Sequence, residues 1–301
     1  MSAAEMQPQS MVVRMQTGEQ IHYLEWDSGQ PGVPMVLIHG LARTAWTWLP
    51  VARRLADSRP VVALDLRGHG ASDAPLAGYD LESLAPDALT VVAGKGWGEA
   101  VDGPPAVVAG HGLGAMVAAE MSVTQPASIA ALALVDGGWE EMAEATRMSP
   151  PELLAAMEDP DEVMASMDAY LGDRRDFDPA SWDADQEIAA RAQVNEKHAG
   201  HVRLAVKASV LRRVVDAMYA YRPIETLGRV PCRMLALVAS SGAADDDEER
   251  ERDLALGDVA RARSEAELPE MRVQRFVGVG HDLMRYRPDA VAQALTELAE
   301  A

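Results

Sequence analysis

Short apolar runs alternate with stretches of helical periodicity along much of the chain. Residues 35–38, 106–109 and 129–135 are continuous apolar runs, and 61–66 is apolar except for Asp65; such segments suit strands buried on both faces. Between them, Trp48, Val51, Ala52 and Leu55 share one helical face, and 81–93 and 115–121 are further helical segments. This alternation predicts an α/β fold, in which a mostly parallel, twisted sheet carries helices on both faces.

The alternation stops at Trp139. From 139 to 223 the chain is acidic, rich in methionine and helical in pattern, without a strand-like run. Strand patterns resume at 234–238 and 273–277, and a final helix follows. We therefore expect a loose tail at 1–10, a sheet core formed by 11–138 and 224–301, and a helical cap at 139–223 over the carboxyl ends of the strands.

Composition narrows the classes of partner. The 301 residues carry a net charge of -20, which disfavours nucleic acid and anionic membranes as partners. The single cysteine, Cys232, fits a reducing compartment, and the N-terminus lacks the order of a signal peptide. We expect a soluble, cytoplasmic monomer or homodimer that acts on a small molecule. The charge run at 245–249, continuing to Asp253, is interpreted as solvated surface.

The segments that follow the predicted strands carry the candidate chemistry. They are His39-Gly40-Leu41, Asp65-Leu66-Arg67-Gly68-His69-Gly70, Gly110-His111-Gly112-Leu113-Gly114, Asp136-Gly137-Gly138 and Gly280-His281-Asp282. In an open parallel sheet, ligands bind at the carboxyl ends of the strands. These segments are therefore predicted to meet around one site.

This ordered set resembles the α/β-hydrolase superfamily, from about residue 11 to the end of the chain. Residues 37–41 are similar to the oxyanion loop of the family, and Gly110–Gly114 lies where its nucleophile elbow, Gly-x-Ser-x-Gly, belongs. Gly280-His281 is similar to the catalytic-histidine segment. The resemblance implies the α/β-hydrolase fold, with the inserted helices as a lid over the site.

The chain departs from this pattern at the nucleophile. Gly112 stands where the family has serine, and glycine has no side chain on which an acyl-enzyme could form. Cys232 should lie at the opposite end of the sheet, and Ser72 lies on a loop with no reason to point inward. Ordinary serine-esterase chemistry is therefore excluded.

The remaining machinery is implied by the resemblance. His281 is the candidate general base, and the backbone N–H groups of Leu41 and Leu113 would form an oxyanion hole. Asp136 is favoured as the acid that orients His281, because an unpaired carboxylate ending a buried strand would be costly; Asp245 or Asp246 is the alternative. The predicted pocket residues are His39, Gly40, His111, Trp46 and Trp139.

Other ligand classes have weaker support. Gly110-x-Gly112-x-x-Ala115 also fits a dinucleotide fingerprint, but this reading leaves His39-Gly40 and Gly280-His281 unexplained. His198 and His201 lie three apart on a predicted helix without a third ligand, so we expect no metal. No cofactor is expected. Methionines of the insertion, such as Met142, Met157 and Met218, suit an adaptable lid or ordinary packing.

Three functions remain open at this stage. The first is an enzyme without a covalent intermediate, in which His281 takes a proton from water or from a small, largely apolar carbonyl substrate. Such an enzyme would carry out lyase, cyclase or carbon–carbon chemistry, or direct attack by water. The second is an ester or lactone hydrolase disabled by the change from serine to glycine at 112. The third is a binding protein that keeps the pocket without turnover.

Overall fold

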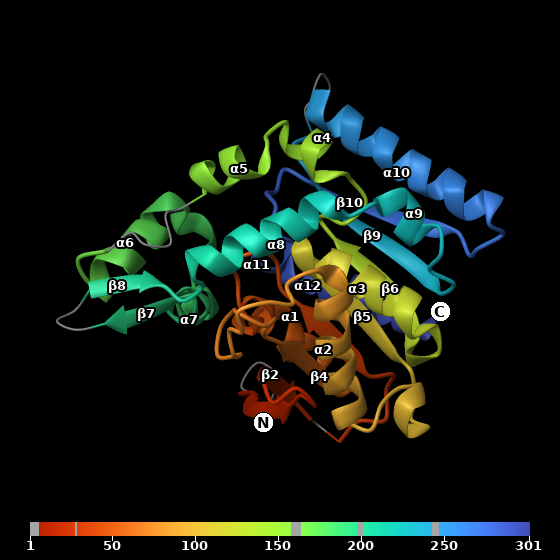
Figure 1. Ribbon diagram of the computed structural model, residues 1–301, viewed down its shortest axis with the longest axis horizontal. Coiled ribbons are helices and arrows are strands. Elements are labelled where there is room, and N and C mark those ends of the chain that lie inside the picture. Colours follow the sequence, from red (N-terminus) through yellow and green to blue (C-terminus); the bar gives the residue numbers. More distant parts are fainter. Residues whose placement is uncertain (1–5, 28, 158–163, 198–200, 243–246) are drawn as a thin grey trace.

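The computed structural model describes residues 6–27, 29–157, 164–197, 201–242 and 247–301. An eight-stranded sheet has the order β1-β2-β4-β3-β5-β6-β9-β10 (Figure 1). The strands are β1 (Gln9–Arg14), β2 (Gln20–Trp26), β3 (Met35–Ile38), β4 (Val61–Leu64), β5 (Ala106–His111), β6 (Ile129–Val135), β9 (Arg233–Ser240) and β10 (Met271–Val277). β2 is antiparallel to β1 and β4, and the other neighbours are parallel. The predicted mostly parallel sheet is confirmed.

Two helical layers cover the sheet because alternate strand residues face opposite sides. Met35 and Leu37 belong to the core shared with α1 (Leu49–Leu55) and α12 (Pro288–Glu300). Val36 and Ile38 belong to the core shared with α2 (Leu81–Gly94) and α3 (Leu113–Thr124). The short elements between them are η2 (Ala45–Trp48), η3 (Glu99–Val101), η4 (Pro126–Ser128) and α11 (Leu283–Tyr286).

The chain between β6 and β9 forms the insertion. It contains α4 (Met142–Thr146), α5 (Pro150–Ala156), α6 (Met167–Phe177), η5 (Pro179–Ser181), α7 (Ala184–Ala192), α8 (Ala208–Ala220) and α9 (Pro223–Leu227). In Figure 1, α6 and α7 lie to one side of the sheet, and α8 runs back towards it. Across the described part of the chain, none of the helices combines the length and apolar character needed to cross a bilayer.

The insertion also holds a two-stranded antiparallel sheet, β7 (Val194–Lys197) with β8 (His201–Leu204). The sequence pattern predicts no strand here and places His201 on a helix; His198 lies outside the described residues. That interpretation was wrong for His201, because these strands are short and mostly polar and carry no apolar run. Their pairing with each other, rather than burial against a large sheet, produces the strand conformation.

Two further segments differ from the prediction. β1 begins at Gln9, so the segment 1–10 is not a loose tail throughout; its residues 1–5 lie outside the described residues. The charge run contributes the first turns of a long helix, α10 (Asp247–Glu265), which packs against α9 and α4. Hydrogen bonds to β2 hold residues 9–10 in a strand. Packing against α9 and α4 stabilises the helix that begins in the charge run.

Candidate functional site

A tight turn joins β5 to α3 at the predicted elbow. Gly112 has φ +52° and ψ -113°, a backbone conformation that residues with a side chain rarely adopt. A side chain on Gly114 would collide with the backbone oxygen of Ile38, in the neighbouring strand. The two glycines that also fit a dinucleotide fingerprint are explained by the turn itself, because a side chain on Gly110 would collide with the backbone of Gly114 and Gly112 has a positive φ.

The tip of the turn faces an imidazole. A Cβ built on Gly112 would lie 3.6 Å from Nε2 of His281 and 4.0 Å from the Cα of Gly40, which are ordinary contact distances. The space beside Gly112 is thus open to a small group, and such a group would point at His281. His281 lies on the loop after β10, so two distant parts of the chain meet here.

His281 is held by Asp136, which directly follows β6. Their Nδ1 and Oδ2 atoms lie 2.7 Å apart, and the Asp136 side chain is 3% exposed. Burial raises the pKa of Asp136, but the hydrogen bond from His281 and the charge of Arg252 outweigh burial and lower this pKa overall. The carboxylate therefore accepts, Nδ1 donates, and in the neutral ring Nε2 carries a lone pair towards Gly112. The alternative acids, Asp245 and Asp246, lie outside the described residues.

Arg252 of α10 is a site residue that the sequence interpretation missed. Its Nη2 donates to Oδ1 of Asp136 at 2.7 Å, and its Nε donates to Glu140 at 3.2 Å. The guanidinium also lies over the Trp139 ring, 5.2 Å from its centroid. Arg252 belongs to the charge run, which the sequence predicts to be solvated surface. That interpretation is wrong for this side chain, because helical periodicity turns it inward while Arg250 remains exposed.

His111 supports the loop that carries His281. Its ring lies 4.2 Å from the His281 ring, and its Nε2 donates to the backbone oxygen of His281 at 3.1 Å. Burial, with a further contribution from the charge of His281, lowers the pKa of His111 to about 3. His111 is therefore neutral at physiological pH, and its role at this position is to hold the loop.

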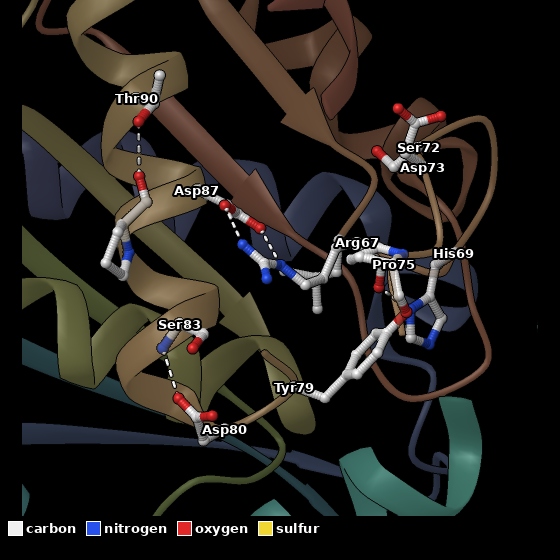
Figure 2. A network of polar contacts seen from close by, with 12 residues as sticks. Arg67, His69, Ser72, Asp73, Pro75, Tyr79, Asp80, Ser83, Asp87 and Thr90 are labelled. Carbon is white, nitrogen blue, oxygen red and sulfur yellow. Dashed lines mark hydrogen bonds and ion pairs between the residues drawn. The ribbon is translucent and has the colours of Figure 1, made fainter. Parts of the chain in front are cut away.

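The segment after β4 is structural. Arg67 pairs with Asp87 of α2 through both carboxylate oxygens, and Tyr79 donates to the backbone oxygen of Pro75 (Figure 2). His39 donates from Nδ1 to the Gly40 oxygen at 2.7 Å and accepts at Nε2 from the N–H of Leu66 at 3.0 Å. Since both ring nitrogens of His39 are occupied by backbone groups, this ring braces the loop.

A cavity of about 650 Å³ opens around the turn. Its lining includes these predicted site residues: Gly40, Leu41, His111, Gly112, Leu113, Asp136 and His281. Four methionines also line it, and Met142, Met157 and Met218 of the insertion are among them. The insertion thus contributes adaptable apolar side chains to the cavity.

Three predicted pocket residues differ from the prediction. The described lining does not include His39, Trp46 or Trp139. His39 is buried beneath the loop, and Trp46 packs against the core on the α1 and α12 side of the sheet. Trp139 is buried beside Arg252 and lines a second cavity, between α4, α9 and α10. Position along the chain could not reveal which way these rings turn.

The two candidate substitute nucleophiles lie elsewhere. Ser72 donates its hydroxyl to the backbone oxygen of Asp65 at 2.6 Å, on the loop after β4. Cys232 lies just before β9, at the amino end of this strand. Burial raises the pKa of its thiol to about 11. Neither residue lines the cavity at Gly112 within the described part of the chain.

The geometry can be compared with known proteins. The model of the alpha/beta hydrolase family matches residues 35–294. The chain belongs to this family. The sequence is 29% identical over 128 residues to (E)-2-((N-methylformamido)methylene)succinate hydrolase of Acinetobacter baylyi, covering 42% of this chain and 45% of that protein. It is 36% identical over 83 residues to a soluble epoxide hydrolase of Corynebacterium sp., 28% of each chain. The chain thus spans less than half the length of these curated relatives.

Solved structures resemble the whole fold. The structure of E-2-(acetamidomethylene)succinate hydrolase has a TM-score of 0.78 and 21% identity, and the match covers 98% of this chain and 100% of that one. A thioesterase domain from the curacin biosynthetic pathway has a TM-score of 0.73 and 19% identity, covering 96% and 99%. At these identities the likeness concerns the fold. Hydrolases are therefore prominent among both the sequence relatives and the structural neighbours.

Proposed function

We propose that this chain is an enzyme of the alpha/beta hydrolase family that acts on a small, largely apolar carbonyl substrate without a covalent acyl intermediate. The observation that carries the proposal is the direction of His281: its Nε2 would lie 3.6 Å from a Cβ at position 112, where no side chain stands. A base with an orienting carboxylate therefore faces open space, and a water molecule or a substrate C–H can occupy that space.

The proton transfer is the central step. In the hydrolytic version, Nε2 of His281 takes a proton from a water whose oxygen attacks the carbonyl, and the proton is then given to the leaving group. In the non-hydrolytic version, Nε2 takes a proton from the carbon beside the carbonyl, and an enolate forms. Asp136 stabilises the imidazolium in both versions, because its carboxylate accepts from Nδ1 at 2.7 Å.

Backbone donors would stabilise the negative oxygen. Leu113 is the first residue of α3, so its N–H is one of those that a helix start leaves without an intrahelical partner. Leu41 lies in the segment after β3, which pairs with β5, and both leucines line the cavity. We infer that their N–H groups form the oxyanion hole, whose donors do not depend on a side chain at 112.

The cavity supports an apolar substrate. Leu41, Leu113 and Met116 come from the core, and the insertion adds further apolar side chains. Arg43 pairs with Asp282 at 2.9 Å, and Arg252 pairs with Asp136 and Glu140. Both cations that line the cavity are thus already engaged by carboxylates within the described chain, which favours an uncharged substrate over an acidic one.

The experiment follows turnover and adducts together. Small esters, lactones, thioesters and β-diketones are incubated with the unaltered chain, and product formation is measured alongside intact-protein mass. We expect steady turnover of at least one class without a burst, and no acyl adduct that forms and disappears at the rate of turnover. Loss of this turnover in His281→Ala, with substrate binding retained, supports His281 as the base. An acyl adduct formed at the rate of turnover would overturn the proposal.

A second candidate is favoured by the open space at 112, which would accept a serine side chain. In that case the chain is an ester or lactone hydrolase lacking only its nucleophile. The matched pair Gly112→Ser and Gly112→Ala distinguishes the two, because both variants add a Cβ and only one adds a hydroxyl. Strong ester hydrolysis by Gly112→Ser alone, beside an inert parent, supports this second candidate. Binding without turnover in every form supports a ligand-binding homologue.

A further inference from the structure

A second histidine–aspartate pair lies outside the cavity. His22 of β2 and Asp65, which follows β4, are buried, and their Nδ1 and Oδ2 atoms lie 2.8 Å apart. The Asp65 carboxylate also accepts from the backbone N–H groups of Ala45 at 2.7 Å and Ala71 at 2.9 Å. These contacts fix the position of the carboxylate and the plane of the His22 ring.

The hydrogen-bond pattern determines where the proton of His22 lies. Burial raises the pKa of Asp65, but the hydrogen bonds and nearby histidines outweigh burial and lower this pKa overall. An ionised carboxylate only accepts, so Nδ1 of His22 donates. In the neutral ring, Nε2 is then an acceptor, and Oγ of Ser10 lies 2.7 Å from it. The Ser10 hydroxyl donates this bond, which is the arrangement of an activated serine.

Ser10 is accessible to reagents. It lies on β1, which is at one end of the sheet order and, among the described strands, pairs with β2 alone; Ser10 is an exposed residue. Two residues along β1, Val12 lies opposite His22 in the register and is 53% exposed. An edge strand also presents backbone N–H groups that no neighbouring strand uses. A small acyl donor could thus find an apolar contact and a hydrogen-bond donor beside the hydroxyl.

We propose that Ser10, His22 and Asp65 form a second nucleophilic site, at which Ser10 accepts an acyl group from small activated acyl donors such as thioesters and phenyl esters. Ser10 Oγ forms the bond to the acyl carbon, and the bond from this carbon to the leaving group breaks. His22 Nε2 takes the hydroxyl proton and passes it to the departing thiolate or phenolate. The product is an ester on Ser10. This site is independent of the chemistry proposed at Gly112.

The direct test is acetylation by p-nitrophenyl acetate, with peptide mass mapping of the whole chain. Gly112 carries no competing nucleophile. We expect acetyl on Ser10, no such peptide in Ser10→Ala, and about 10²-fold slower labelling in His22→Gln, which removes the base. Ser264, an exposed serine of α10, is the internal control. Equal labelling of Ser10 and Ser264 would overturn the proposal.

A second measurement does not require His22 to be replaced. In the S10C variant the new thiol faces His22 Nε2, and its alkylation by iodoacetamide is followed against pH. We expect alkylation at pH 6 to be at least about 10-fold faster than in the control variant M11C, because the imidazole stabilises the thiolate. Met11 is exposed on the other face of the same strand. Identical pH profiles for the two variants would contradict activation by His22.

Discussion

Two histidine–aspartate pairs among the described residues have nearly the same geometry in different settings. Nδ1 lies 2.7 Å from the carboxylate in the His281–Asp136 pair and 2.8 Å in the His22–Asp65 pair. The first pair faces a cavity and a turn without a nucleophile, whereas the second holds a serine on an exposed strand. A histidine held by a carboxylate can therefore occur without a substrate cavity beside it, because different segments of the chain form the pair and the cavity.

The exposure of the two bases differs more than their distances. The His281 side chain is 58% exposed and the His22 side chain is 7% exposed, although both carboxylates are nearly buried. His281 can exchange a proton with whatever occupies the cavity. His22 can do so only through Ser10, because the protein surrounds the rest of its ring.

The largest expected effect is on turnover. Replacing His281 with alanine should lower kcat by about 10²–10⁴-fold, because general base catalysis is lost. The free energy of unfolding should also fall, by about 1–3 kcal/mol, because the buried Asp136 carboxylate loses the hydrogen bond from His281 and keeps the one from Arg252. Steady-state kinetics and denaturant unfolding measure both effects. His201→Ala, an exposed histidine of β8, is the control and should retain full activity. Unchanged turnover in His281→Ala would remove this residue from the mechanism.

Arg252→Met should give the next largest effect. It leaves Asp136 and Glu140 without their cation in a largely buried setting, and we expect a loss of about 3 kcal/mol in the free energy of unfolding. Urea denaturation measures it. Arg250→Met removes an exposed arginine from the same helix and should change stability by less than about 0.5 kcal/mol. Equal losses in the two variants would show that Arg252 does not act through these carboxylates.

Gly112→Ala should destabilise the chain by about 1–3 kcal/mol, because a side chain is placed at φ +52°. Gly112→Ser should lose a similar amount, since its Cβ meets the same atoms. Thermal or urea denaturation measures both variants. A control substitution, Gly257→Ala, adds a Cβ to α10 where no atom lies within 4 Å, and it should be neutral or stabilising. No loss of stability in either variant at 112 would show that the turn relaxes.

Acid should weaken the fold through both pairs. The pKa of Asp136 and the pKa of Asp65 are lowered in the folded chain, so below the ordinary value of about 3.9 the unfolded chain binds more protons. The stability from each pair is present above that value and is lost as the pH falls through the folded pKa. Unfolding measured between pH 6 and pH 2 should show a steeper loss in the parent than in Asp136→Asn. Equal slopes would contradict a lowered pKa for Asp136.

The sequence allowed most of the fold to be predicted. The apolar runs at 35–38 and 129–135 coincide with β3 and β6, because strands buried on both faces need continuous apolar residues. The order of glycine and histidine motifs identified the family. The hairpin of β7 and β8 escaped prediction, since its strands are short and polar and are stabilised by pairing with each other.

The order of residues along the chain determined the sheet, the family and the vacancy at Gly112. Only the tertiary structure decided which side chains meet. It brings Arg252 to Asp136 from a helix that looked like solvated surface, turns Trp46 and Trp139 away from the cavity, and sets Ser10 against His22. The physical reason is that local periodicity specifies which face of an element is buried. The partner across a contact depends on how elements far apart in the sequence pack together.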